Sequence, residues 1–258
     1  MAARSLPVPA QPRRGVPGRP RGRRAVSSAT PRTVPTLELE TELARAGHRF
    51  VAGMDEVGRG ALAGPASVGL AVLDLERMAG GAPSDPPPWH GVRDSKALSP
   101  ARRAALAGTI AAWAVGTAVG HAQPREIDQF GVTAALRLAG LRALATVAAH
   151  GTRVDALILD GSHNWLDAPP VLGQDADDTA LPPVVRTFVR ADAHCVSVAA
   201  ASILAKVERD ELMVSLGREF PAYAWESNKG YGSAVHRAAL LEHGTTPQHR
   251  LSWNLGAR

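Results

Sequence analysis

The order of short apolar runs and helix-like segments along the chain constrains its fold most strongly. Three runs rich in Val and Ala come first, at residues 50–58, 65–75 and 111–122, and glycines bound them. Such runs are typical of neighbouring β-strands. Two more strand-like runs follow at 154–162 and 184–193, while apolar residues recur at helical spacing over 132–150 and 196–218. Strands that cluster and then alternate with helices predict an α/β sheet with helices packed on it.

The segments between these runs are rich in proline and glycine. One such loop leads into a predicted helix that has Pro100 in its first turn. Residues 166–183 are polar, acidic and Pro-rich, which predicts a surface loop. A glycine loop, a short helix and an irregular segment are expected near the C-terminus.

Residues 1–36 differ in composition from the rest of the chain. Residues 1–35 hold eight arginines, seven prolines and no acid, more positive charge than the chain's formal net charge of +5. Because this composition cannot bury enough apolar surface to fold, we expect a disordered tail at 1–36 and one folded domain at 37–258. The tail is a solvated extension, a loose arm for phosphate backbones, or a transit peptide that its prolines disfavour.

The chain lacks the features of secreted and membrane proteins. No apolar signal core follows the arginines, and we expect no run of about 18 apolar residues. The single cysteine, Cys195, excludes internal disulfides and a Cys-based zinc site. We therefore expect a cytoplasmic protein without a membrane partner.

Acids close three of the strand-like runs: Asp55 with Glu56, then Asp160, then Asp192. Strand ends in one sheet lie close together, and converging carboxylates repel one another unless a cation neutralises them. Oxygen ligands favour Mg²⁺ or Mn²⁺, although acids at strand ends also cap helices and begin turns. Adjacent strand residues point to opposite faces, so either the strand breaks between Asp55 and Glu56 or one of them is not a direct ligand.

Lysine is rare in this chain. Only Lys96, Lys206 and Lys229 stand among 29 basic residues. Compact ammonium groups suit phosphate, so these positions are candidates for substrate contact, although three cases can also arise by chance.

Seven stretches together resemble the ribonuclease HII family, the type 2 ribonucleases H, over about residues 50–254. In chain order they are GMDEVGRGALAGP, DSKALSPARR, EIDQFGVTAAL, ILDGS, DAHCVSVAAASILAKVERD, NKGYGS and HGTTPQHRLSW. The resemblance implies a ribonuclease H-like fold, with a mixed central sheet flanked by helices and a small C-terminal helical part at about 220–258 that binds substrate.

The resemblance also implies a function. A monomeric endonuclease would cut 5′ to ribonucleotides in RNA–DNA hybrids and in DNA duplexes with embedded ribonucleotides, leaving a 3′-hydroxyl and a 5′-phosphate, with two Mn²⁺ or Mg²⁺ ions. The family's four acids fall on Asp55, Glu56, Asp160 and Asp192. The substrate-binding residues would be Gly58, Arg59, Gly60, Lys96, Lys206 and Tyr231.

Other interpretations remain at this point. The fold could serve a catalytically silent hybrid binder, or the sister type HIII enzyme, although residues 1–35 cannot form the folded N-terminal domain that type HIII implies. His249 and Arg250, in the stretch PQHRLSW, are further candidates for DNA contact.

Overall fold

The computed structural model describes residues 34–81, 84–167 and 181–256. Residues 1–33 of the predicted tail and residues 168–180 of the predicted acidic loop therefore lie outside the described residues. Backbone pairing begins early in the described part, because the Thr36 amide donates to the His194 carbonyl at 2.8 Å. The last residue of the predicted tail is thus already paired with the folded body.

A five-stranded sheet forms the centre of this body. Its strands are β1 (Phe50–Val57), β2 (Ala66–Asp74), β3 (Gly116–Ala122), β4 (Ala156–Asp160) and β5 (Val184–Phe188), in the spatial order β3-β2-β1-β4-β5. The first three strands pair antiparallel, whereas β4 runs parallel to β1 and to β5. The predicted mixed sheet is confirmed.

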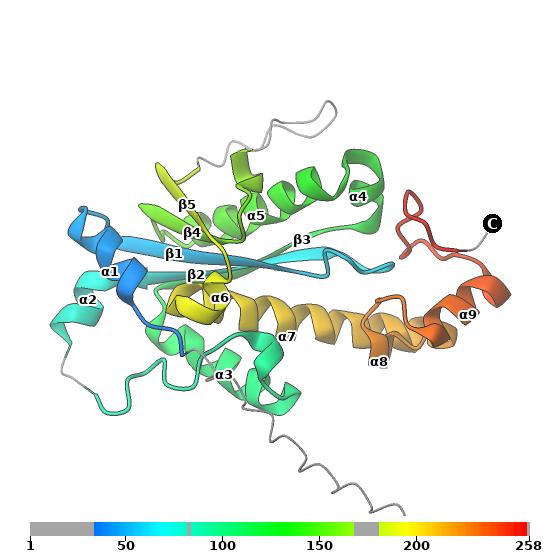
Figure 1. The fold of residues 1–258 in the computed structure, drawn as a ribbon, viewed down its shortest axis with the longest axis horizontal. Helices are drawn as coiled ribbons and strands as arrows, with labels where there is room; N and C mark the ends of the chain where they lie inside the picture. The colour runs from blue at the N-terminus through cyan, green and yellow to red at the C-terminus, as the bar shows by residue number, and fades with distance from the viewer. Residues whose placement is uncertain (1–33, 82–83, 168–180, 257–258) are drawn as a thin grey trace, which may run out of the picture. The chain divides into compact units, whose positions relative to one another are not determined.

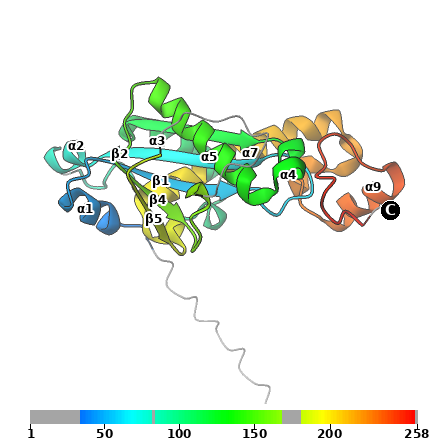
Figure 2. The same cartoon turned by 90° about the horizontal axis from the view of Figure 1, so that it is seen from above.

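Helices cover both faces of the sheet (Figures 1 and 2). One face carries α7 (Val196–Glu219), α3 (Pro100–Trp113) and α1 (Glu38–Arg45), and the other carries α5 (Val132–Ala149) and α4 (Pro124–Phe130). The side chains of β1 alternate accordingly, with Val51 in the first core and Ala52 and Met54 in the second. Two short helices, α2 (Leu75–Gly80) and α6 (Ala191–His194), follow β2 and β5.

Two glycines let α7 lie directly on the sheet. A Cβ atom at Gly53 would stand 2.2 Å from the backbone carbon of Ser197, and one at Gly69 would stand 2.2 Å from the carbonyl oxygen of Ala201. Real Cβ atoms do not approach that closely, so both positions require glycine for helix and strand backbones to touch. This contact brings α7 against the end of β1 that carries Asp55.

Helix α5 corrects one expectation from the sequence. Its 18 residues have a mean hydropathy of 1.4, so by length and composition this helix could cross a membrane. The sequence analysis expected no apolar run of about 18 residues and so did not identify this helix as one that passes that test. In the structure 56% of this window is buried, and its apolar side chains pack on the sheet as part of the second core. Packing against the sheet therefore accounts for its hydropathy.

A small helical part completes the fold at the far end of α7, as predicted (Figure 1). It consists of a 3₁₀ turn (Pro221–Tyr223), α8 (Trp225–Asn228) and α9 (Ala234–His243). Its core joins Trp225 and Leu240 to Met213 of α7 and to Leu62 and Ala63 of the β1–β2 connection. The connection after β1 is therefore built into the C-terminal part.

Candidate active site

Asp55 and Asp160 lie on neighbouring strands at one edge of the sheet. The parallel register pairs Met54 with Leu159, so the next residues on the two strands are Asp55 and Asp160. Met54 and Leu159 both face α5, and alternation turns the two acids toward α7. One oxygen of Asp160 accepts the Ala191 amide at 2.6 Å, which fixes the start of α6 beside the strand end.

Asp192 joins this group from α6, not from a strand end as predicted. Strand β5 stops at Phe188, and Arg190 takes a left-handed conformation with φ 61° before the helical turn begins. The turn buries Asp192, which is 7% exposed. This placement is compatible with the prediction that Asp192 belongs with the other acids. The prediction that Asp192 ends a strand was wrong, because it lies in α6.

The electrostatics show that these carboxyl groups act on one another. Burial raises the pKa of Asp55 well above its usual value, and the charges of Asp160, Glu56 and Asp192 raise it further. The pKa of Glu56 is also raised, mainly by burial, with Asp160 adding to the shift and Arg59 opposing it. Burial, followed by the charges of Asp94 and Asp160, raises the pKa of Asp192 to about 6. Repulsion of this kind favours a bound cation.

Lys96 supplies a positive charge beside the acids. It lies in the 3₁₀ turn Ser95–Ala97, which Asp94 begins by accepting the Lys96 amide at 2.8 Å. Burial alone would lower the pKa of Lys96, but nearby carboxylates, Asp55 first and then Asp192, outweigh it and raise that pKa. The predicted substrate-binding lysine is thus placed at the acid cluster.

The carboxylates fit a hard divalent cation by chemistry. Asp55, Glu56, Asp160 and Asp192 offer only oxygen atoms, the ligands that Mg²⁺ and Mn²⁺ prefer. Within residues 34–81, 84–167 and 181–256, however, no three His, Cys, Asp or Glu side chains meet closely enough to form a ready-made metal site. The four carboxylates therefore lie at one edge of the sheet, but their oxygen atoms are not close enough together to coordinate one ion without rearrangement.

The strand does not break between Asp55 and Glu56. Pairing with β2 continues in regular register through Asp55, Glu56 and Val57, whose partners are Gly69, Val68 and Ser67. The bend that would turn both acids to one face is therefore absent from this pairing, which leaves the other alternative, that one of the two acids is not a direct ligand. Asp55 faces α7 and Glu56 the opposite side, where Arg59 lies 3.4 Å from its carboxylate. The two acids therefore reach the strand end from opposite faces.

Gly58, Arg59 and Gly60 form the turn that directly follows this strand. Gly58 has φ +78°, a left-handed conformation that glycine adopts readily. Arg250 donates to the carbonyls of Gly58 and Arg59 at 2.6 and 2.7 Å. A Cβ atom at Gly60 would meet nothing within 4 Å, so this backbone is open to a ligand. The turn that the sequence predicted to bind substrate is thus exposed on one side and hydrogen-bonded on the other.

Tyr231 lies next to this turn, in the loop between α8 and α9. The preceding Gly230 carbonyl accepts the amides of Leu62 and Ala63 at 2.8 and 3.2 Å, which joins the two loops. The Tyr231 side chain is 39% exposed, and the guanidinium of Arg209 lies 5.7 Å from its ring centroid. The structure therefore brings together two segments that the sequence predicted to bind substrate and that are about 170 residues apart in the sequence.

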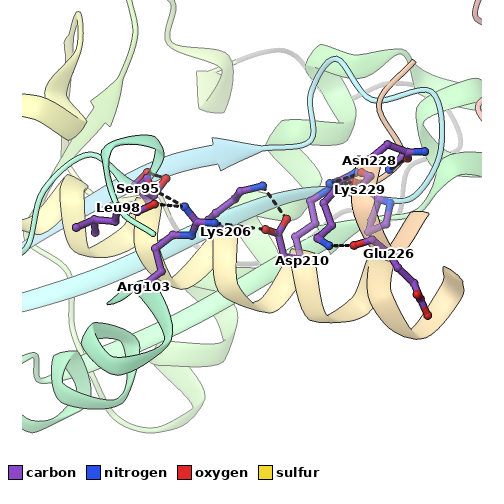
Figure 3. A network of polar contacts seen from close by, with 12 residues as sticks. Ser95, Leu98, Arg103, Lys206, Asp210, Glu226, Asn228 and Lys229 are labelled. Carbon is purple, nitrogen blue, oxygen red and sulfur yellow. Dashed lines mark hydrogen bonds and ion pairs between the residues drawn. The ribbon is translucent and has the colours of Figure 1, made fainter. Parts of the chain in front are cut away.

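Lys206 has a protein partner. Figure 3 shows its ammonium group against Asp210, at 2.7 Å. Arg103 lies in the same network and donates to the carbonyls of Ser95 and Leu98 at 2.8 and 2.7 Å. A phosphate contact by Lys206 must compete with Asp210, and this role stays a prediction.

His249 and Arg250 are not DNA contacts. They are 1% and 0% exposed, because both are buried where the C-terminal segment meets the β1–β2 connection. The suggestion from the sequence was wrong for these two residues. Another buried arginine, Arg209 of α7, was not singled out at all, and it also bonds this connection.

Comparison with known sequences shows the family to which the chain belongs. The sequence model of the family described as Ribonuclease HII matches residues 52–255. A Ribonuclease HII from Streptomyces avermitilis is 46% identical over 220 residues, which cover 85% of this chain and 83% of that protein. Another, from Paracoccus denitrificans, is 43% identical over 222 residues, 85% of this chain and 91% of that protein.

Solved structures resemble it in fold. The ribonuclease H2 from Pyrococcus horikoshii has a TM-score of 0.60 and 25% identity, with 80% of this chain and 94% of that chain covered. Bst-RNase HIII, solved in complex with Mn²⁺, has the same TM-score and identity, with 80% of this chain but 67% of that chain covered.

Proposed function

Because the chain belongs to the ribonuclease HII family and is thus a ribonuclease H, we propose that it cuts the phosphodiester bond 5′ to a ribonucleotide. Its substrates would be RNA–DNA hybrids and DNA duplexes with embedded ribonucleotides, and its role would be the removal of ribonucleotides from DNA. The observation that supports this most directly is the position of the turn at residues 58–60, which continues the strand that carries Asp55 and Glu56. Bond-cutting acids and a sugar-reading backbone thus stand side by side.

The acids would hold the metal. Asp55, Glu56, Asp160 and Asp192 would hold Mn²⁺ or Mg²⁺, two ions in the family's usual arrangement, and one of Asp55 and Glu56 would act without being a direct ligand, because the two lie on opposite faces of the strand. A solved relative, Bst-RNase HIII, contains Mn²⁺. Such ions would activate the attacking water and stabilise the leaving 3′ oxygen. Burial of Asp55 and Asp192 keeps these carboxylates in a low-dielectric site, where their attraction for a cation is stronger than in water.

The chain's other residues would recognise the substrate. Backbone groups at Gly58, Arg59 and Gly60 can approach a sugar closely, and a 2′-hydroxyl both donates and accepts hydrogen bonds. Lys96, beside the acids, would attract the scissile phosphate. The exposed ring of Tyr231 would stack on a neighbouring sugar or bond a phosphate through its hydroxyl. We further propose a cytoplasmic monomer.

A cleavage assay tests this proposal. The substrate is a labelled DNA duplex with one ribonucleotide, and its control is the same duplex made of DNA alone. We expect one nick on the 5′ side of the ribonucleotide, loss of nicking in EDTA, and recovery with Mn²⁺. Equal cutting of the all-DNA duplex would contradict the specificity, whereas tight binding without any cutting in Mn²⁺ would indicate a silent binder.

A further inference from the structure

Two arginines under the residue 58–65 connection are buried without a counter-charge. Arg209 of α7 and Arg250 of the C-terminal segment are both 0% exposed. In the described part of the chain neither forms an ion pair with a carboxylate, and Asp210, the neighbour of Arg209 in sequence, pairs with Lys206 and Arg103. Burying a charge is costly unless it is hydrogen-bonded, so the partners of these guanidinium groups decide what they do.

Backbone carbonyls take the place of carboxylates. Arg209 donates to the carbonyls of Pro65 (2.9 Å), Ala63 (3.2 Å) and Lys229 (3.0 Å). Arg250 donates to those of Gly58 (2.6 Å), Arg59 (2.7 Å) and Gly64 (3.1 and 3.2 Å). Five of these six carbonyls belong to residues 58–65, and the sixth lies two residues before Tyr231.

Backbone hydrogen bonds also join the 58–65 connection to the loop before Tyr231 and to the C-terminal segment around Arg250. The Leu62 amide donates to Gly230 at 2.8 Å, the Gly64 amide donates to Gln248 at 2.8 Å, and the Arg250 amide donates to Leu62 at 3.0 Å. Gly58 leaves room for this arrangement, because a Cβ atom there would stand 2.0 Å from Nε of Arg209. The Arg209 guanidinium therefore fills space that a side chain at position 58 would take.

We propose that Arg209 and Arg250 are positioning residues that hold residues 58–60 and Tyr231 in the conformation that reads the ribose 2′-hydroxyl. They act on the substrate only through the backbone and the ring that they fix. This inference rests on the proposed function, whose sugar-reading turn it explains. It predicts that selectivity for the 2′-hydroxyl depends on two side chains that never touch nucleic acid.

The chemistry of the arginine side chain supports this role over simple stabilisation. A guanidinium presents five N–H donors in a fixed plane, so one group can bond several carbonyls at once, whereas the three donors of lysine radiate from a single atom. The two charges also oppose each other: burial, followed by the charge of Arg209, lowers the pKa of Arg250 to about 9. Apolar side chains would avoid the cost of burying two like charges, but they would leave these carbonyls without donors.

The test uses the conservative variants Arg250→Lys and Arg209→Lys, which keep the charge but lose the fork. Hydrogen–deuterium exchange is measured first, on peptides covering residues 58–65 and 229–232 of the full chain. We expect faster exchange in both segments, with unchanged exchange in the strands. The matched control is Arg142→Lys. Arg142 of α5 bonds the His121 carbonyl of β3 at 2.6 Å and pairs with Glu126 of α4, so this variant should leave both segments protected.

The second readout is selectivity for the sugar. Cleavage is compared on duplexes that carry one ribonucleotide or one 2′-fluoro nucleotide at the same position. A displacement of about 1 Å in a positioned group costs up to about 100-fold in rate, so we expect kcat/KM on the ribonucleotide to fall between about 10- and 100-fold. Cleavage of the 2′-fluoro duplex should fall much less, and binding of an all-DNA duplex should stay within about twofold.

The outcomes separate this inference from the proposed function. A wild-type protein that does not nick the ribonucleotide duplex would refute the function, while the exchange data would still decide whether the arginines hold the loops. Unchanged exchange and an unchanged 2′ ratio in Arg250→Lys would overturn the inference. If Arg250→Lys does not fold, Arg209→Lys, which loses its bonds to Pro65, Ala63 and Lys229, must by itself speed exchange in both segments and lower the 2′ ratio.

Discussion

Replacing Gly53 by alanine tests whether α7 lies in direct contact with β1. The added Cβ atom would stand 2.2 Å from the Ser197 carbon and 2.2 Å from the Val198 nitrogen. Comfortable contact needs about 3.5–4.0 Å, so the start of α7 must move by roughly 1.5 Å. Because these neighbours are backbone atoms, no side-chain rotation can relieve the overlap.

This displacement sets the expected loss of stability. Overpacked cores usually cost about 1–3 kcal/mol, and a clash with helix backbone belongs at the upper end, about 2–3 kcal/mol. Nicking should fall as well, because Asp55 lies two residues further along the strand and interacts with Ser202 of the displaced helix. The measurement is urea unfolding followed by circular dichroism, with the free energy of unfolding compared at an unchanged m-value.

Gly108→Ala is the matched control. Gly108 lies inside α3, and a Cβ atom there would meet nothing within 4 Å. Alanine is favoured over glycine in a helix interior by about 0.5–1 kcal/mol, so this variant should be more stable than the wild type. If the free energy of unfolding of Gly53→Ala were within about 0.5 kcal/mol of the wild-type value, α7 could not lie against β1 in the way described.

Three further predictions follow from burial and charge. Asp55→Asn should abolish nicking with little effect on binding. In metal-free buffer it should raise the free energy of unfolding by about 1 kcal/mol or more, because it removes a buried charge that other carboxylates repel. A variant less stable than the wild type would contradict this. Burial, followed by the charge of His236, lowers the pKa of His249 to about 4. The free energy of unfolding, measured in urea, should therefore fall as the pH drops from about 6.5 toward 4, and it should change less with pH in His249→Gln. Deleting residues 1–33, with their eight arginines, should weaken duplex binding and flatten its salt dependence while single-turnover cleavage stays nearly unchanged; an identical salt slope would exclude an electrostatic arm.

Regular periodicity explains which elements the sequence predicted. The helices at 132–150 and 196–218 correspond to α5 and α7, and the helix with Pro100 in its first turn is α3, capped by the Ser99 side chain. Errors fall where one element stops. The third strand begins at Gly116, not at 111, because α3 continues to Trp113. The alanines of this stretch are compatible with a helix as well as with a strand, so its composition does not show where the helix ends. Boundaries of this kind depend on packing that the sequence pattern does not contain.

The site divides in the same way. Motifs predicted which acids and which turn belong together, since strand ends converge at a sheet edge. The unbroken pairing of Asp55 and Glu56 with β2 could not be read from the chain, because glycines after a strand permit a bend without requiring one. Glu40 was also missed: it is buried and caps α7 from α1, accepting the Ser197 amide at 2.9 Å.

Arg209 could have been found from the sequence. It shares a stripe of four-residue spacing on α7 with Ala205, Met213 and Gly217, and all four are buried. An arginine on an otherwise small and apolar stripe signals a buried guanidinium. Its charge alone would place it on the polar face of the helix, which is the usual position of an arginine but not the one found here. Arg250 gave no comparable signal, since its segment has no regular period.

The charges at the two ends of the site are arranged against stability. At the strand end, Asp55 and Asp192 are buried among other carboxylates, whereas Arg209 and Arg250 are buried one loop away with carbonyls as partners. Pairing these arginines with these acids would neutralise both groups. It would also occupy the oxygens that a divalent cation would need, and it would leave the carbonyls of residues 58–65 without the arginines that bond them. Keeping these acids and arginines apart from each other is costly for the fold, and it is the arrangement that the proposed metal-dependent, sugar-reading function would require.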